Sequence, residues 1–154
     1  MTDRTARSLS DIGAEPTFCT IDGLSIRFVE SDPRDTDALL FSPWPESVFA
    51  YEPIWSRLAE TAHLVAVDLP GFGRSERKDA LMTPRTMGDF ILRVADEFQL
   101  QKPHVVAPDI GTSASLFAAA TPRSLPEPGR WHRRRGCSDC ARGSATGVGV
   151  RSRS

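Results

Sequence analysis

The chain of 154 residues has few cysteines, a single tyrosine and no long apolar segment. Its three cysteines are an odd number and do not suggest a disulfide framework. No apolar run approaches the roughly 18 residues that a membrane-spanning helix needs. Residues 1–16 lack the apolar core of a signal peptide. We therefore expect a cytoplasmic protein with no membrane partner.

The composition that is present suits one globular domain, with 40% hydrophobic and 25% charged residues and a net charge of −1. This average hides a change near residue 120. Residues 1–120 hold 11 Lys or Arg and 18 Asp or Glu, a net charge of −7, whereas residues 121–154 hold 8 Arg against 2 acidic residues, a net charge of +6. The sequence thus predicts an acidic folded part followed by a basic tail.

The basic tail, residues 121–154, is rich in Ser, Gly and Pro and cannot bury enough apolar surface to offset its ordering entropy. We expect it to be disordered and of low complexity. We interpret its many Arg and absent Lys as GC-rich codons translated in a shifted frame. Residues 1–16 are expected to be flexible and residues 17–120 to fold.

Metal, cofactor and nucleic-acid sites are not expected in this tail. Cys137 and Cys140 form a Cys-x-x-Cys pair, but only His132 lies near as a further zinc ligand. Arg133 to Arg135 could contact phosphates, which keeps a non-catalytic binding module as an alternative. Arginine in such a tail is usually solvated, however, and interleaved aromatic residues are lacking.

Residues 17–120 show the pattern of an α/β fold. Residues 18–21 and 24–29 flank Asp22-Gly23, which favours a tight hairpin, and in the second arm apolar residues alternate with Ser25 and Arg27. Apolar runs predict buried strands at 38–41, 63–67 and 105–107, and amphipathic or small-residue patterns predict helices over 51–62, 84–98 and 113–120. We expect a hairpin, then parallel strands with helices on both faces of the sheet.

Sites in such sheets form beyond the carboxyl ends of the strands, here residues 42–49, 68–76 and 107–112. The last segment, Ala107-Pro108-Asp109-Ile110-Gly111, has small residues two positions before and after Asp109. This spacing fits a nucleophile elbow, a strained strand-to-helix turn that presents its central side chain. Asp109 is therefore the candidate reactive residue.

At these residues the chain resembles the α/β-hydrolase family, nearest to its aspartate-nucleophile branch of epoxide hydrolases and haloalkane dehalogenases. The segment Asp68-Leu-Pro-Gly-Phe-Gly-Arg-Ser75-Glu76 is similar to the loop after the family's fourth strand. Residues 42–47, Ser-Pro-Trp-Pro-Glu-Ser, are similar to its oxyanion loop, usually His-Gly-x-Pro. The resemblance covers about residues 17–120 and implies an incomplete α/β-hydrolase sheet.

The resemblance implies that Asp109 is the nucleophile, which attacks an epoxide or halogen-bearing carbon to give an ester that water then hydrolyses. The backbone N–H groups of Ile110 and Trp44 would be the oxyanion donors, and Trp44-Pro45 a cis peptide. Small apolar epoxides, halides or esters are the implied substrates, and no cofactor is implied. Ile110 replaces a family Trp, which disfavours halide binding.

In the family, the lid, the acid residue and the catalytic histidine come later than the elbow helix. We therefore expect a truncated, catalytically incomplete hydrolase that traps its ester. His63 and His104 start predicted strands at the other end of the sheet, where surface or edge positions are expected. The uncovered strand at 105–107 would then be an open edge, so we also expect poor solubility.

Two interpretations of the elbow stay open. Asp109 could be a helix N-cap and nothing more. Alternatively, Ser113 could be the nucleophile of a serine-type esterase, although that register would bury the Asp109 charge. For Asp68 we expect a loop-orienting hydrogen-bond acceptor rather than a catalyst.

Overall fold

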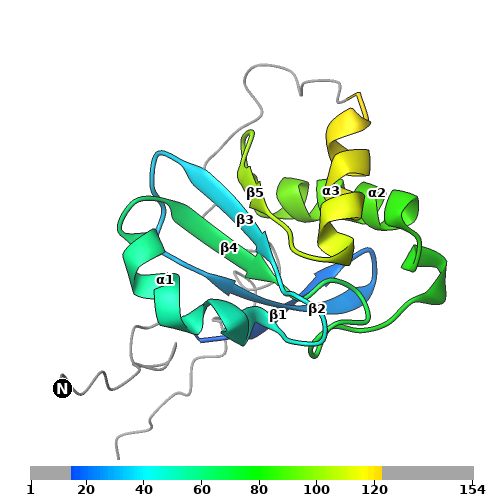
Figure 1. Ribbon diagram of the computed structural model, residues 1–154, viewed down its shortest axis with the longest axis horizontal. Coiled ribbons are helices and arrows are strands. Elements are labelled where there is room, and N and C mark those ends of the chain that lie inside the picture. The colour runs from blue at the N-terminus through cyan, green and yellow to red at the C-terminus, as the bar shows by residue number, and fades with distance from the viewer. Residues whose placement is uncertain (1–14, 123–154) are drawn as a thin grey trace, which may run out of the picture.

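The structure, a computed structural model, describes residues 15–122. They form a five-stranded mixed sheet in the order β1-β2-β4-β3-β5 (Figure 1). The strands are β1 (Thr17–Ile21), β2 (Leu24–Glu30), β3 (Asp37–Phe41), β4 (His63–Val67) and β5 (His104–Val106). The helices are η2 (Val48–Tyr51), α1 (Glu52–Ala59), η3 (Asp79–Leu81), α2 (Pro84–Glu97) and α3 (Ile110–Ala120).

The first two strands form the predicted antiparallel hairpin, with Ile21 paired to Leu24. Asp22 and Gly23 have φ angles of 51° and 78°, the left-handed conformations that a tight two-residue turn requires. One feature of the strand pattern is wrong. Arg27, expected on the solvent side of a half-buried strand, is only 5% exposed.

Strands β3, β4 and β5 run parallel, so their carboxyl ends meet at one edge of the sheet. Strand β3 lies between the other two, with Leu39 paired to both Val65 and Val105. Among the described residues, β5 pairs only with β3. Val105 and Val106 are 44% and 47% exposed, in line with the open edge expected for this strand although its apolar run alone had predicted burial.

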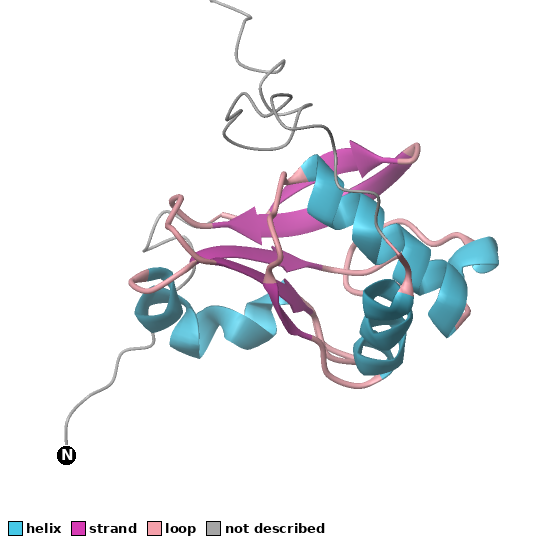
Figure 2. Cartoon of the chain, turned by 90° about the horizontal axis from the view of Figure 1, so that it is seen from above, coloured by secondary structure: helices cyan, strands magenta, loops and turns pink. Residues whose placement is uncertain are grey.

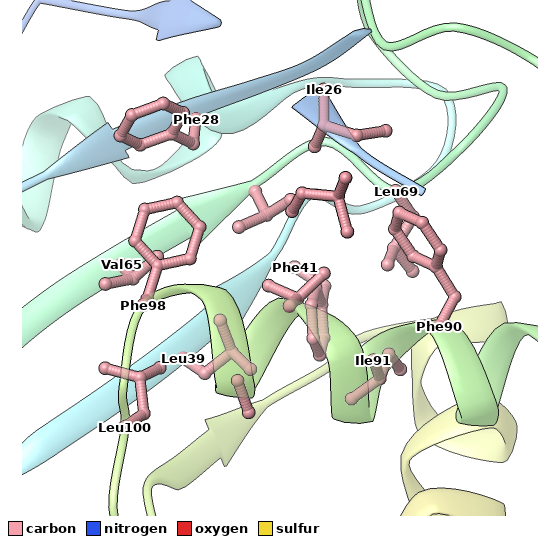
Figure 3. Packing of buried hydrophobic residues seen from close by; sticks show 14 of the residues in the cluster. Ile26, Phe28, Leu39, Phe41, Val65, Leu69, Phe90, Ile91, Phe98 and Leu100 are labelled. Atoms are coloured by element: carbon pink, nitrogen blue, oxygen red, sulfur yellow. The ribbon is translucent and has the colours of Figure 1, made fainter. Parts of the chain in front are cut away.

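Helices cover both faces of the sheet, as expected. Helix α1 packs on one face, and α2 and α3 pack side by side on the other (Figures 1 and 2). The larger core lies under α2, where Phe90, Ile91 and Phe98 meet Phe41 and Leu39 from the sheet (Figure 3). The smaller core lies under α1 and includes Trp55.

Helix α2 follows its sequence pattern closely. The Thr83 hydroxyl caps it by accepting a bond from the Thr86 N–H at 3.2 Å. The stripe of apolar residues predicted to face the core is buried, and comprises Met87, Ile91, Val94, Ala95 and Phe98. Helix α1 is shorter than the predicted 51–62, because it ends at Ala59, and Ile54 of its predicted stripe is 47% exposed.

Several predictions lie outside the described residues. These are the flexible N-terminus, apart from its last two residues, and nearly all of the basic tail, including His132, Cys137, Cys140 and the arginines at 133–135. In residues 15–122, no helix is long and apolar enough to cross a membrane. That same part of the chain contains no cluster of three or more side chains suited to holding a metal ion.

Candidate active site

Three loops meet at the carboxyl edge of the parallel strands. Residues 42–47 follow β3, residues 68–76 follow β4, and residues 107–109 join β5 to α3. Hydrogen bonds connect these segments: the N–H of Val48, directly after the first loop, donates to Asp68, and the Trp44 N–H donates to Asp109. The three segments singled out from the sequence are thus brought together.

Asp109 occupies the sharp turn between β5 and α3. Its φ of 53° and ψ of −126° lie in a backbone region that residues other than glycine rarely adopt. The Gly111 N–H donates to the Pro108 carbonyl at 3.0 Å, which closes the turn. This is the strained strand-to-helix geometry of a nucleophile elbow, and it places the Asp109 side chain in an exposed position.

The Asp109 carboxylate makes no capping bond to α3. Instead, its Oδ2 accepts a hydrogen bond from the Trp44 backbone N–H at 3.1 Å, across 65 residues of chain. The geometry therefore contradicts the interpretation of Asp109 as a helix N-cap and nothing more. The peptide between Trp44 and Pro45 is cis, as the resemblance implied.

The residues flanking Asp109 are close-packed. A Cβ added to Gly111 would lie 3.4 Å from the Ala107 Cβ and 3.6 Å from the Phe41 Cβ. That is ordinary van der Waals contact, so one methyl group fits and a longer side chain would displace its neighbours. The Thr112 hydroxyl also donates to the Ala107 carbonyl and ties the helix start to the strand end.

Ile110 is the first residue of α3, where backbone N–H groups have no acceptor within the helix. The Trp44 N–H is the donor to the Asp109 carboxylate, and the Ile110 N–H directly follows Asp109 in the chain. Ser113 lies one turn further into α3. The strained turn is therefore centred on Asp109, and Ser113 lies inside the helix rather than at the turn.

Asp68 is fully buried and organises the loop after β4. Its Oδ2 accepts from Nε of Arg27 at 2.6 Å and from the Arg74 N–H at 3.2 Å, and its Oδ1 accepts from the Val48 N–H at 2.8 Å. Gly73 must be glycine, because a Cβ there would lie 2.0 Å from Asp68 Oδ2. Asp68 is therefore the loop-orienting acceptor that the sequence predicted.

Arg27 was missed as part of this arrangement. Its guanidinium forms a buried ion pair with Asp68, lies 5.4 Å from the Phe49 ring centroid, and explains why a strand arginine is buried. The Arg27 N–H also donates to the Ser75 hydroxyl at 2.8 Å. No signal in the sequence predicted this pair, because Arg27 and Asp68 are 41 residues apart and only the fold brings them together.

His63 and His104 both lie at the amino ends of their strands, opposite the elbow. His104 is exposed, but His63 is 8% exposed, so its predicted surface position is wrong. Its ring nitrogens lie 2.9 Å from Asp37 Oδ1 and 3.0 Å from Glu30 Oε1. Burial lowers the pKa of His63, but the hydrogen bonds and charges of these two carboxylates outweigh it and raise the pKa above 6.5.

An open hollow of about 560 Å³ lies beside the loop at residues 45–47. Phe18, Phe49 and Arg74 contribute to its lining, but Asp109 does not. We therefore do not assign this hollow to a substrate of Asp109.

No family model matches the chain. Among curated proteins, it is 30% identical over 122 residues to the dihydrolipoyllysine-residue acetyltransferase component of the acetoin cleaving system of Cupriavidus necator, covering 75% of this chain. It is 29% identical over 89 residues to a soluble epoxide hydrolase of Corynebacterium sp. strain C12, covering 58% of this chain. The chain spans 31% of the length of each relative.

Solved structures of an epoxide hydrolase and a haloalkane dehalogenase are also similar to this chain. The epoxide hydrolase CorEH without ligand superposes with a TM-score of 0.63 at 25% identity, covering 68% of this chain and 37% of that one. The haloalkane dehalogenase DatA from Agrobacterium tumefaciens C58 superposes with a TM-score of 0.59 at 26% identity, covering 67% and 35%.

With its sheet order, elbow and matched structures, the described part of the chain is part of an α/β-hydrolase fold. Within that class, the chain is similar to epoxide hydrolases and haloalkane dehalogenases.

Proposed function

We propose that Asp109 is a nucleophile that opens a small apolar epoxide and forms a covalent ester. The observation that carries this proposal is the position of the Asp109 carboxylate. It lies in a strained turn, makes no capping hydrogen bond to α3, and accepts a hydrogen bond at Oδ2 from the Trp44 N–H at 3.1 Å. Similarity to epoxide hydrolases supports the choice of an epoxide as the electrophile. The replacement of a family Trp by Ile110 makes haloalkanes the poorer substrates.

The two carboxylate oxygens have different parts in this reaction. Asp109 Oδ1 attacks a ring carbon, the ring C–O bond breaks, and both its electrons go to the oxygen, which takes a proton from water. Oδ2 becomes the ester carbonyl and keeps its bond from the Trp44 N–H. When water adds to this carbonyl, negative charge develops on Oδ2, where the N–H groups of Trp44 and Ile110 stabilise it.

Hydrolysis of the ester also needs a general base for the water. We propose that neither described histidine is that base, because both lie at the opposite edge of the sheet and both ring nitrogens of His63 contact carboxylates. Ester formation is then the step that the described residues carry. The ester accumulates unless a base is supplied from elsewhere.

The test is the mass of the full chain during incubation with 1,2-epoxyhexane. We expect a mass increase equal to one epoxide per chain in the wild type and none above background in Asp109→Asn. Asp89→Asn, which alters an exposed carboxylate on α2, is the matched control and should react as the wild type does. Equal labelling of all three proteins would contradict the proposal. A mass that rises and then falls, with diol released, would show that the ester turns over.

A further inference from the structure

Two hydrogen bonds to the side chains of Tyr51 and Asp68 hold the two ends of the loop that carries Trp44. At its start, the Tyr51 hydroxyl donates to the Phe41 carbonyl at 2.6 Å. At its end, the Val48 N–H donates to Asp68 Oδ1 at 2.8 Å. Between these two points, the Trp44 N–H reaches the Asp109 carboxylate.

Both of these hydrogen bonds involve buried side chains. Tyr51 is 7% exposed, and its phenol is the group that closes the base of the loop against the end of β3. Asp68 is 0% exposed and is itself held by the guanidinium of Arg27 at 2.6 Å. Bonds in such a dry environment fix geometry more firmly than exposed ones do, because water does not compete for the donors and acceptors.

We propose that Tyr51 and Asp68 are positioning residues, which hold the loop at residues 42–47 so that the Trp44 N–H faces Asp109 Oδ2. This inference rests on the proposed nucleophilic role of Asp109. Displacing catalytic groups by about 1 Å can lower a rate by about 100-fold, so small shifts of this loop matter. The Trp44 N–H is a backbone group and depends on the loop for its place.

Each of these two hydrogen bonds can be removed without replacing a charged residue. Tyr51→Phe deletes one hydroxyl and keeps the ring. Val48→Pro deletes the N–H that Asp68 accepts from and leaves the pair of Arg27 and Asp68 intact. Proline is tolerated at the first position of a helix, which Val48 occupies in η2.

Two control variants separate other causes. Thr61→Val deletes a hydroxyl that donates to the Leu58 carbonyl at 2.9 Å, the same kind of bond at the far end of α1. Val48→Ala removes side-chain packing but keeps the N–H, so the comparison with Val48→Pro isolates the bond to Asp68.

The experiment has two readouts on the full chain. The first is the alkylation rate with 1,2-epoxyhexane, separated into the maximal rate and the half-saturating epoxide concentration. The second is the amide NMR signal of Trp44 followed with pH, because an N–H bonded to a carboxylate shifts as that carboxylate protonates.

We expect Tyr51→Phe to lower the maximal rate at least tenfold, with a half-saturating concentration within twofold of the wild type. Val48→Pro should do the same relative to Val48→Ala. In both variants the Trp44 amide should lose its titration, whereas Thr61→Val should leave the rate and the titration unchanged. A Trp44 amide that titrates normally in Tyr51→Phe and Val48→Pro would overturn the inference. If even the wild type is not alkylated, the proposed function fails, and the amide titration alone decides the positioning role.

Discussion

Asp109 shows a conflict between stability and chemistry in one residue. A non-glycine residue at φ 53° and ψ −126° costs of the order of 1–3 kcal/mol of folding free energy. The surrounding contacts, the Ala107 carbonyl and the start of α3, keep the turn in place. Such strain is expected where a side chain must be presented at a sharp turn rather than packed.

The conflict gives a prediction at this residue. Asp109→Gly should raise the free energy of unfolding by about 1 kcal/mol, because glycine adopts this backbone conformation without a Cβ clash. The same change should abolish alkylation. Chemical denaturation of both proteins measures the first effect, with Asp89→Gly as a helix control that should destabilise. A less stable Asp109→Gly protein would show that the turn is not strained.

At the scale of elements, the contact between α2 and α3 depends on Gly88. A Cβ at this position would lie 2.8 Å from the Ala114 carbonyl oxygen and 3.0 Å from the Ala118 nitrogen. The two helices can therefore approach only because residue 88 has no side chain. This packing fixes α3, and with it the residue that precedes the helix, Asp109.

Gly88→Ala should therefore reverse the usual helix propensity effect. Alanine ordinarily stabilises a helix interior by about 1 kcal/mol over glycine. Here the added methyl group meets backbone atoms, and we expect a loss of about 1–3 kcal/mol. Thermal unfolding checks this, with Asp89→Ala on the exposed side of α2 as the control, expected to be neutral or stabilising. An increase in melting temperature for Gly88→Ala would disprove the close contact.

His63, at the amino end of β4, joins Asp37 at the amino end of β3 to Glu30 at the carboxyl end of the antiparallel strand β2. Its pKa is raised in the folded state, so its contribution to stability is fully present below the unfolded value of about 6.5. That contribution is lost as the pH rises through the higher folded-state pKa. Relative to His63→Gln, the wild type should lose unfolding free energy above pH 6.5.

Denaturation curves between pH 5 and 9 would measure this difference, roughly the range in which histidine titrates. His104→Gln changes the exposed histidine at the same edge and should keep the pH dependence of the wild type. A wild-type advantage over His63→Gln that grows with pH would contradict the assigned environment.

Sequence patterns predicted those features that depend on neighbours in the chain. The hairpin at Asp22-Gly23, the Thr83 cap and the position of Asp109 between small residues are all local signals. The burial of Arg27 and His63 was not predictable in this way. Each is buried by charged partners at least 26 residues away in sequence, and only the fold brings them together.

At the scale of the whole molecule, the described part of the chain ends in an uncovered apolar region. Strand β5 has a neighbour only on its β3 side within residues 15–122, and Val105 and Val106 are 44% and 47% exposed. Leu116 and Phe117 of α3 are also exposed. Unpaired apolar edges of this kind promote association between chains. The predicted division of the chain into a flexible N-terminus (1–16), a folded part (17–120) and a basic tail (121–154) stays a prediction.

We expect the full chain to self-associate as its concentration rises, and Val106→Lys to reduce this association. A charge on an edge strand opposes pairing with a second edge and costs little stability at an exposed position. Sedimentation velocity measures the effect. Ile54→Lys is the matched control, because Ile54 is equally exposed but lies on α1. A wild-type chain that is monodisperse at high concentration would contradict this prediction.

The most direct test of the account is to locate the covalent adduct. The full chain is treated with 1,2-epoxyhexane, digested and sequenced by tandem mass spectrometry. We predict one ester, on the carboxylate of Asp109, that hydroxylamine cleaves. An adduct spread over exposed carboxylates such as Asp79 and Asp89, or one that leaves Asp109 unmodified, would contradict the claim that the elbow carries the nucleophile.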